Sequence, residues 1–409
     1  MPHLLLQLSV ILATARVLAL LLRHFGQPAV IGEMIAGFVL GPIVFGALAP
    51  TWHATLFPSD GLAALQGLSQ LGLVLFMFIV GAELRAPHGT RAPLIAAAWV
   101  GIPGVLLPGM LGLAIAPTLH ARFAPPGVGV WPFALFMAAA LAITAFPVMA
   151  RILKDRGLTR TPLGQLALAA SAIADVLVWL LLAFVIASIS ARGENALVRT
   201  IGGLVLAGAF AFCVLRPLLA RLLARHARDS RPGGAVLSVL LIGTCAMAAA
   251  TEWLGLHAVF GAFLAGLCLP RDDRLLDTLV ERLEHVAVLV LMPVFFALAG
   301  LGTRADAFSG AGIPALLLIL AAAVLGKMLG AGGGARIAGL DWRSAFAVGS
   351  LMNARGLMEL IVLKVGLDAG VIGAGMFTLL MAMTIVTTLM ATPMLGACLH
   401  RDRAGTAIP

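Results

Sequence analysis

Charged residues are scarce in this sequence. Of its 409 residues, 11% are charged and 61% are hydrophobic, and the mean hydropathy is +1.07. Soluble domains usually contain about a quarter charged residues. The composition therefore excludes an ordinary soluble protein and indicates a helical integral membrane protein, with room for about a dozen spans and little else.

Groupings of reactive side chains are also absent. The four cysteines lie inside apolar runs without a pairwise motif, which favours ordinary packing over a disulfide framework or a metal cluster. No Ser-His or Cys-His pairing, aspartyl pair or metal-ligand spacing occurs at membrane depth, and the nine histidines lie mostly in loops or at span ends. These absences argue against a membrane-embedded enzyme, and no cofactor is expected.

Lysine is rare, and the basic residues are dispersed. The net charge of +9 comes from 24 Arg and 3 Lys, which stand singly in short loops, so nucleic-acid binding is a poor explanation. In alternate loops these residues divide 19 to 5, with the remaining 3 of the 27 inside spans. The positive-inside rule then predicts a cytoplasmic C-terminus and, for an odd number of spans, an outside N-terminus in the cell (inner) membrane.

Thirteen apolar segments are long enough to be membrane-spanning or buried helices. They are residues 4–22, 28–47, 62–83, 93–117, 131–152, 163–190, 198–223, 235–252, 254–270, 286–303, 311–335, 343–364 and 370–398. We therefore predict an all-α polytopic membrane protein with about 13 transmembrane helices, whose whole length, 1–409, forms one transmembrane domain.

Two stretches of the chain repeat. VIGEMIAGFVL, residues 30–40, aligns without gaps on VFGAFLAGLCL, residues 259–269, and the following spans correspond weakly through Gly81 and Gly300. Span 2 runs outward and span 9 inward in the predicted topology, so the similarity indicates inverted repeats of five helices each, as in secondary transporters. Chance similarity between helices packed through small residues is the alternative.

Spans 5 and 12, which the repeat pairs, are both irregular. Pro147 in span 5 removes a backbone hydrogen bond and disfavours helical geometry at Phe146. In span 12, Asn353, Arg355 and Gly356 interrupt an apolar run. Pro147 alone would suit a tolerated kink, but matching breaks in the two halves point to a transport site, where freed carbonyls and half-helix ends coordinate ions.

One acid lies near the middle of span 6. Counted from Leu163, Asp175 is about 18 Å into an apolar layer roughly 30 Å deep. An ionisable group at this depth is a functional hypothesis, and we predict that Asp175 binds either a monovalent metal cation or a proton. Ser171 and Thr144 are the candidate neutral oxygen ligands, although such hydroxyls often bond only their own helix.

Other charges lie at similar depth. Lys327 on span 11 is a candidate counter-ion or a group that releases its own proton. Arg355 and Glu359, four residues apart on one face of span 12, favour a structural pair. Glu33 and Glu83, near the cytoplasmic ends of spans 2 and 3, are interpreted as interfacial or structural residues.

Several long motifs resemble one known family. QPAVIGEMIAGFVLGP, LGLVLFMFIVGAEL, TAFPVMARILKDRGLTRTPLGQLALAASAIADVLVW, HAVFGAFLAGL and MNARGLMELIVLKVGLDAGVI are similar to the monovalent cation:proton antiporter-2 family of Na⁺/H⁺ and K⁺/H⁺ exchangers. The resemblance implies an ion-transport bundle including spans 4–6 and 11–13, a dimerisation part including spans 2–3 and 9–10, crossed broken helices, and a homodimer with elevator-like alternating access.

The sequence departs from that family at one informative position. Many members have Asp-Asp where this chain has Ala174-Asp175, and electroneutral relatives often have Asn-Asp. In electrogenic relatives the first Asp pairs with the lysine that Lys327 matches, so the resemblance favours electroneutral one-for-one exchange or altered coupling. Because the sequence ends at Pro409, we expect no soluble C-terminal regulatory domain.

These observations favour an antiporter that exchanges Na⁺ or K⁺ for H⁺ across the lipid bilayer, and such exchange would serve pH homeostasis. A sodium-coupled organic-anion transporter of related fold remains the alternative, with Lys327 and Arg355 as its anion contacts. The single intramembrane acid, without a wide polar lining, argues against that alternative.

Overall fold

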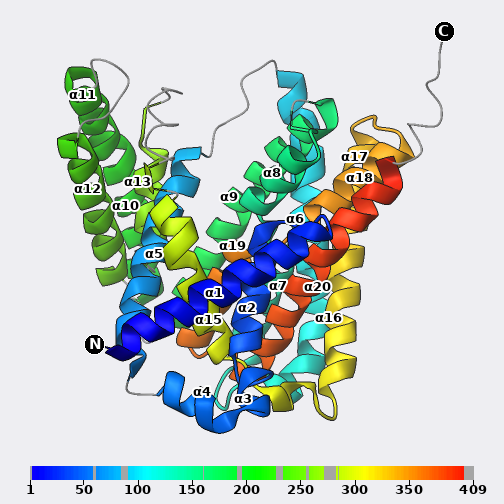
Figure 1. Ribbon diagram of the computed structural model, residues 1–409. Coiled ribbons are helices and arrows are strands. Elements are labelled where there is room, and N and C mark those ends of the chain that lie inside the picture. Colours follow the sequence, from blue (N-terminus) through cyan, green and yellow to red (C-terminus); the bar gives the residue numbers. More distant parts are fainter. Residues whose placement is uncertain are drawn as a thin grey trace. The chain divides into compact units, whose positions relative to one another are not determined.

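The structure is a computed structural model in which every described element is a helix (Figure 1). The residues it describes are 2–58, 61–83, 91–159, 161–190, 196–226, 234–254, 258–270, 282–283 and 285–399. No strand occurs in these ranges. The predicted all-α fold is confirmed.

Nine helical segments in the described ranges are long and apolar enough to cross a membrane. They are formed by α1 (Pro2–His24), α2 with α3 (Ala29–Leu40, Phe45–Leu48), α5 (Ala63–Glu83), α6 (Arg91–Phe123), α9 (Pro162–Ser190), α10 to α11 (Ala196–Phe210, Arg216–His226, joined by η2, Ala211–Leu215), α12 (Gly234–Trp253), α16 to α17 (Gly312–Lys327, Gly333–Ile337, joined by η5, Met328–Gly332) and α20 (Ala374–Leu399).

The other four predicted apolar segments correspond to shorter helices. They are α7 followed by α8 (Val130–Ala142, Phe146–Asp155), α13 (Ala258–Leu267), η3 followed by α15 (Ala287–Leu291, Met292–Leu301), and α18 followed by α19 (Trp342–Met352, Leu357–Asp368). The described ranges also contain two short helices, α4 (Pro50–Leu56) and η4 (Ala305–Phe308).

The chain divides into two compact units. Unit 1 comprises Met1–Leu12, Thr51–Arg85 and Ile186–Leu298, and unit 2 comprises Ala13–Pro50, Ala86–Val185 and Ala299–Pro409. In unit 1 an apolar core joins α5, α13, α12 and the η2–α11 segment, with Phe78, Leu240 and Cys268 among its buried side chains. The assignment of an ion-transport part and a dimerisation part stays a prediction.

Glycines of the repeated segments bring helices into direct backbone contact. A Cβ atom at Gly300 of α15 would overlap the carbonyl oxygen of Gly37 on α2, within unit 2. Within unit 1, a Cβ atom at Gly266 of α13 would overlap the carbonyl oxygen of Phe78 on α5. Gly37 and Gly266 occupy the same position in the repeat, so the two crossings are equivalent and small residues are required at both.

The equivalence extends to the preceding helices. Gly32 of α2 lies against the backbone of α1 at Ala19, and Gly261 of α13 lies against the backbone of α12 at Met247. Gly32 and Gly261 again share one position in the repeat. The contacts of the helices therefore follow the internal repeat that the sequence contains.

A third set of close contacts positions the buried lysine. Three glycines at four-residue spacing on the α16–η5–α17 segment pack against the backbone of α6 at Pro108, Pro103 and Trp99; they are Gly326, Gly330 and Gly334. Lys327 follows the first of these glycines and directly precedes the π-helical turn η5. The lysine side chain is therefore held close to α6.

The Gly37–Gly300 crossing gives a stability prediction. Gly300→Ala places a methyl group on the carbonyl oxygen of Gly37, so the helices must move apart, at a cost of about 1–3 kcal/mol or more for overpacking. We expect a lower melting temperature of the detergent-purified protein. Gly67→Ala on α5, where no atom lies within 4 Å of the new methyl group, is the control. Equal melting temperatures for the two variants would contradict the close contact.

Candidate ion-binding site

The helix formed by span 5 is interrupted just before Pro147. Helix α7 ends at Ala142, Ile143 and Ala145 have extended backbone, and α8 begins at Phe146. Pro147 lies in the first turn of α8, where its missing N–H leaves no helical bond unmade. The break thus precedes Phe146, which is helical, whereas the sequence analysis expected the distortion at Phe146 itself.

Span 12 is interrupted in the same way. Helix α18 ends at Met352, and α19 begins after Gly356. The two breaks meet in a backbone hydrogen bond of 3.0 Å from Ala145 N to Ala354 O. A Cβ atom at Gly356 would lie 2.7 Å from the Val148 side chain of α8, so a glycine permits this close crossing.

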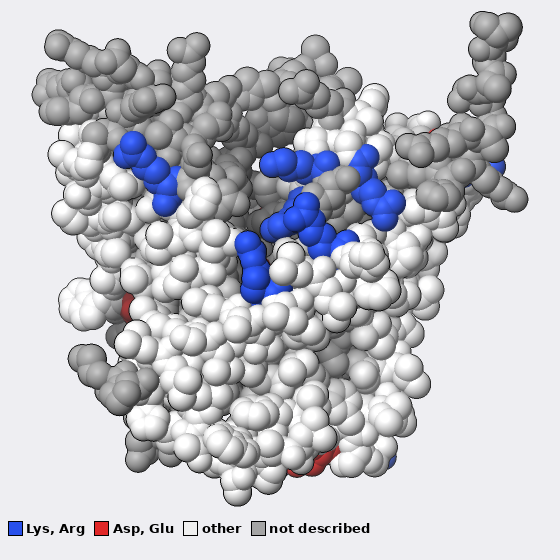
Figure 2. Space-filling model, in the orientation of Figure 1, with Lys and Arg blue, Asp and Glu red and all other residues white. Residues whose placement is uncertain are grey.

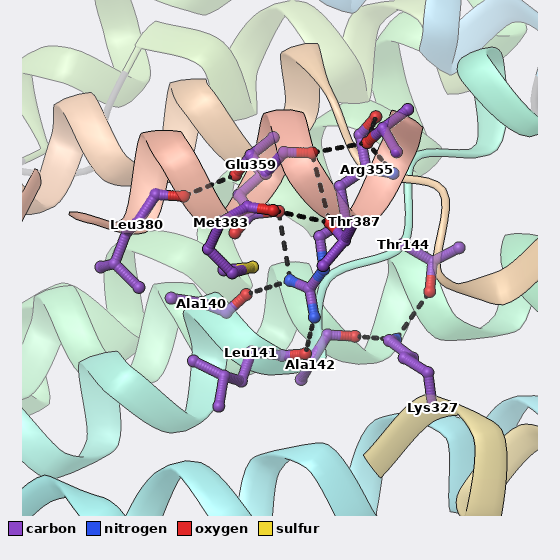
Figure 3. A network of polar contacts seen from close by, with 12 residues as sticks. Ala140, Leu141, Ala142, Thr144, Lys327, Arg355, Glu359, Leu380, Met383 and Thr387 are labelled. Atoms are coloured by element: carbon purple, nitrogen blue, oxygen red, sulfur yellow. Dashed lines mark hydrogen bonds and ion pairs between the residues drawn. The ribbon is translucent and has the colours of Figure 1, made fainter. Parts of the chain in front are cut away.

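The interrupted end of α7 is capped by two buried cations (Figure 3). Arg355 donates from Nη1 to Ala140 O at 2.8 Å and from Nη2 to Leu141 O at 2.6 Å. Lys327 Nζ donates to the next carbonyl, Ala142 O, at 2.5 Å. These carbonyls are among the last four of the helix, which have no partner within it and form the negative end of its dipole.

Lys327 uses its remaining protons on two other neutral acceptors. Nζ donates to Thr144 Oγ1 at 2.7 Å and to Gly104 O at 2.9 Å. Gly104 lies four residues before Pro108 in α6, and Pro108 has no N–H to bond that carbonyl. The amine, which is fully buried, is therefore satisfied by oxygens that two helix irregularities make available.

Arg355 also pairs with Glu359, as the sequence predicted from their spacing. Nη1 lies 3.1 Å from Glu359 Oε2, and both side chains are fully buried. The backbone of Arg355 is held by α20, because its N–H donates to Thr388 Oγ1 at 3.0 Å and its carbonyl oxygen lies 2.9 Å from the same hydroxyl. The pair and the two carbonyl contacts fix the guanidinium group.

Asp175 has no comparable partner. It lies on α9 with only 4% of its surface exposed, and its Oδ2 makes no hydrogen bond with any described residue. No ion pair or hydrogen bond joins it to Lys327, Thr144 or Ser171 within the described ranges, although Lys327 is close enough to influence it electrostatically. A buried carboxylate oxygen without a donor calls for a proton, water or a cation.

The two predicted hydroxyl ligands are oriented as oxygen acceptors. Ser171 donates its proton to Leu168 O at 3.0 Å, and Thr144 donates to Met352 O at 3.3 Å. Both side chains are fully buried. Each hydroxyl proton is engaged by a backbone carbonyl, so each oxygen can act as an acceptor. Thr144 Oγ1 already accepts a hydrogen bond from Lys327 Nζ, and Ser171 Oγ keeps its lone pairs for another ligand.

The remaining candidates lie elsewhere. Glu33 is buried on α2, with 7% of its surface exposed, and the next residue, Met34, lies near Gly356 in the break. The side chain of Glu83 lies outside the described part of the chain. Within the described ranges no three His, Cys, Asp or Glu side chains gather as a polydentate metal site, so Asp175 with neutral oxygens is the candidate for a monovalent ion.

The sequence analysis missed the main-chain partners of Lys327 and Arg355. One signal was present, because Pro108 within an apolar helix implies a free carbonyl at Gly104. The sequence could not predict that Lys327 bonds this carbonyl, because 223 residues separate Gly104 from Lys327.

Buried charges at two crossed helix breaks, inside an all-helical apolar bundle, are typical of secondary transporters. The fold matches the solved structure of the sodium proton antiporter MjNhaP1 from Methanocaldococcus jannaschii with a TM-score of 0.66 and 16% identity, over 97% of this chain and 98% of the other. Residues 9–401 match the family described as sodium/hydrogen exchanger, transmembrane, and the chain belongs to that family.

Curated relatives agree with this assignment. The chain is 37% identical over 387 residues to the Na⁺/H⁺ antiporter NhaS4 of Synechocystis, with 94% of each chain covered. It is 36% identical to cation/H⁺ antiporter 17 of Arabidopsis thaliana and 34% identical to K⁺/H⁺ antiporter 1 of Saccharomyces cerevisiae. These matches cover 97% and 95% of this chain but 48% and 46% of the plant and yeast proteins.

The Thr144 hydroxyl links Lys327 to the second break, and its removal should be costly. Thr144→Val leaves Lys327 Nζ and Met352 O each without one partner, at a cost of about 1–3 kcal/mol. We expect a lower melting temperature in detergent. Thr118→Val, which removes an exposed hydroxyl bonded to Ile115 O in its own helix, should have little effect. An unchanged melting temperature for Thr144→Val would refute the linking role.

Proposed function

We propose that this protein exchanges Na⁺ or K⁺ for protons across a membrane, with Asp175 as the shared site. The observation that carries the proposal is a buried carboxylate oxygen of Asp175 without a donor, on a membrane-spanning helix of a chain from the sodium/hydrogen exchanger family. Thr144 and Ser171 supply neutral oxygens. The named substrates of relatives include both Na⁺ and K⁺, so the proposal keeps both.

The exchange follows from the chemistry of one carboxylate. Ionised Asp175 attracts a dehydrated monovalent cation, whereas protonated Asp175 carries no charge to hold it. A proton and a cation therefore compete for the same oxygens, and each displaces the other. Alternating access presents Asp175 to one side of the membrane and then to the other, so an outward gradient of one ion drives inward movement of the other.

Lys327 acts in this proposal as a fixed structural cation. Its three protons are donated to Gly104 O, Ala142 O and Thr144 Oγ1. Ala174, which precedes Asp175, offers no second carboxylate. With one carboxylate and a lysine that keeps its proton, the cycle carries one positive charge in each direction, which favours electroneutral one-for-one exchange.

The buried basic residues are poorly suited to an organic anion. Arg355 is engaged by Ala140 O, Leu141 O and Glu359, and Lys327 has no proton left to donate. An anion would have to displace these helix-capping bonds. A sodium-coupled organic-anion transporter is therefore the weaker candidate.

The charge distribution of unit 2 supports a cytoplasmic C-terminus. Helix α20 starts near Arg304, whose N–H bonds Thr378, and ends near the side chain of Arg156. Figure 2 shows basic side chains gathered on one part of the molecular surface. The segments α8 and α17–α18 carry exposed basic residues: Arg151, Lys154, Arg156, Arg336 and Arg343. At the other end, Arg304 is paired with Asp306. The unbalanced end is proposed to face the cytoplasm, and a homodimer is the proposed assembly.

Removal of the Asp175 charge should abolish exchange. Asp175→Asn keeps the size of the side chain but cannot alternate between a proton and a cation, so cation-dependent proton flux in proteoliposomes should fall to that of protein-free vesicles. Asp368→Asn, at an exposed residue paired with Lys364, is the matched control and should retain flux. Full activity of Asp175→Asn would reject the proposed site.

Electroneutral exchange predicts no current. Proteoliposomes under a Na⁺ or K⁺ gradient should show proton flux without net charge movement on a solid-supported membrane. Clamping the membrane potential to zero should leave the flux unchanged. A clear current that reverses with the gradient would show that more charge moves in one direction, and Lys327 would then have to titrate.

A further inference from the structure

Asn353 is a buried polar side chain to which neither the helix packing nor the proposed site yet gives a partner. Only 1% of its surface is exposed, and neither Oδ1 nor Nδ2 makes a hydrogen bond with a described residue. A carboxamide can accept two hydrogen bonds and donate two. Burial without any of them is costly, so the side chain requires water or a ligand.

The backbone on both sides of Asn353 is fixed at the crossing of the two breaks. Met352 O accepts a hydrogen bond from Thr144 Oγ1, and Ala354 O accepts one from Ala145 N at 3.0 Å. Asn353 therefore cannot reach a distant partner without loss of these bonds. Its polar atoms stay within the crossing region.

The two breaks present polar side chains at equivalent positions. Thr144 directly precedes Ala145 in the first break, and Asn353 directly precedes Ala354 in the second, and these two alanines bond each other. Thr144 is the oxygen ligand that the first break supplies to the proposed ion site. The internal repeat thus makes Asn353 the counterpart of Thr144.

The nearby cations do not compete for the Asn353 oxygen. Lys327 has donated all its protons elsewhere, and Arg355 directs both its terminal nitrogens to α7 carbonyls. Arg355 and Glu359 form an ion pair and therefore add no net charge, although Nε of Arg355 and Oε1 of Glu359 have no hydrogen-bond partner among the described residues. The three protons of Lys327 are engaged by neutral oxygens, whereas Oδ2 of Asp175 has no donor among the described residues. An ion bound beside that carboxylate is therefore expected to be positive.

We propose that Oδ1 of Asn353 is a neutral ligand of the transported monovalent cation, contributed by the second break opposite Thr144. The inference rests on the proposed function, because it assigns one more ligand to the same ion. A neutral oxygen contributes to cation binding but not to proton binding. Asn353 therefore sets the affinity and ion preference of exchange, whereas Asp175 sets whether exchange occurs.

The test measures cation-dependent proton flux in proteoliposomes for Na⁺, K⁺ and Li⁺, in the parent protein and in Asn353→Ala. We expect KM for the preferred cation to rise about tenfold, as for loss of one interaction with a charged group, with kcat nearly unchanged. The preference among the three cations should also weaken. Thr387→Val, which removes a fully buried hydroxyl bonded to its own helix, is the control and should leave KM and preference unchanged.

Two results would overturn the inference. If Asn353→Ala has a lower melting temperature but parental KM and ion preference, Asn353 holds a structural water and no cation. If that variant does not fold, Asn353→Asp keeps the shape and adds a carboxylate, which should lower KM several-fold for a ligand position; an unchanged KM would overturn the inference.

Failure of the proposed function has a different signature. A parent protein without cation-dependent proton flux would overturn both proposals, whatever the variants do. A parent protein that exchanges ions, together with Asn353 variants of parental KM, would overturn only the assignment of Asn353.

Discussion

The structure depends on how the broken end of α7 is satisfied. A helix that stops inside an apolar bundle exposes its last carbonyls where no water is available, and each unpaired group is costly. Arg355 and Lys327 bond three successive carbonyls of this end, from Ala140 to Ala142. The same contacts stabilise the two buried cations, because each gains hydrogen-bond acceptors at the negative end of a helix dipole. The break and the charges are therefore stable only together, and neither cation donates to Asp175, whose Oδ2 has no hydrogen-bond donor among the described residues.

Close helix packing makes these contacts possible. Gly326, Gly330 and Gly334 let the α16–η5–α17 segment approach α6 at its backbone, and that approach brings Lys327 to Gly104 O. Prolines contribute by freeing carbonyls for distant donors. Pro108 frees Gly104 O for Lys327, and in the same way Pro393 of α20 frees Leu389 O, which accepts a hydrogen bond of 3.2 Å from Gln27 Nε2. Proline in these helices thus frees main-chain oxygens, and glycine lets the helices approach closely. Together they allow these oxygens to bond side chains that are distant in the sequence.

This arrangement also accounts for the alanine before Asp175. The sequence left open whether Lys327, without an acid at position 174, would pair with Asp175 or titrate. In the described part of the structure Lys327 bonds no acid, because its three protons are donated to two helix carbonyls and the Thr144 hydroxyl. Ala174 is fully buried and adds no charge beside Asp175. The neutral oxygens of Thr144, Ser171 and Asn353 are the proposed partners of the ion that Asp175 binds.

The sequence by itself determined the all-helical membrane fold, the repeat and the paired breaks, because hydropathy, glycine spacing and proline position act locally along the chain. It also located Asp175, Lys327 and the Arg355–Glu359 pair, since a charge inside an apolar run is conspicuous. Only the tertiary structure decided that α8 starts at Phe146, that Lys327 bonds Gly104 and Ala142, and that Asn353 is left without a partner. The physical reason is that every residue except proline carries the same main-chain donor and acceptor. Apart from a carbonyl that lies four residues before a proline, the sequence therefore does not mark which carbonyl is free. Which distant side chain bonds a free carbonyl depends on how closely the helices approach each other.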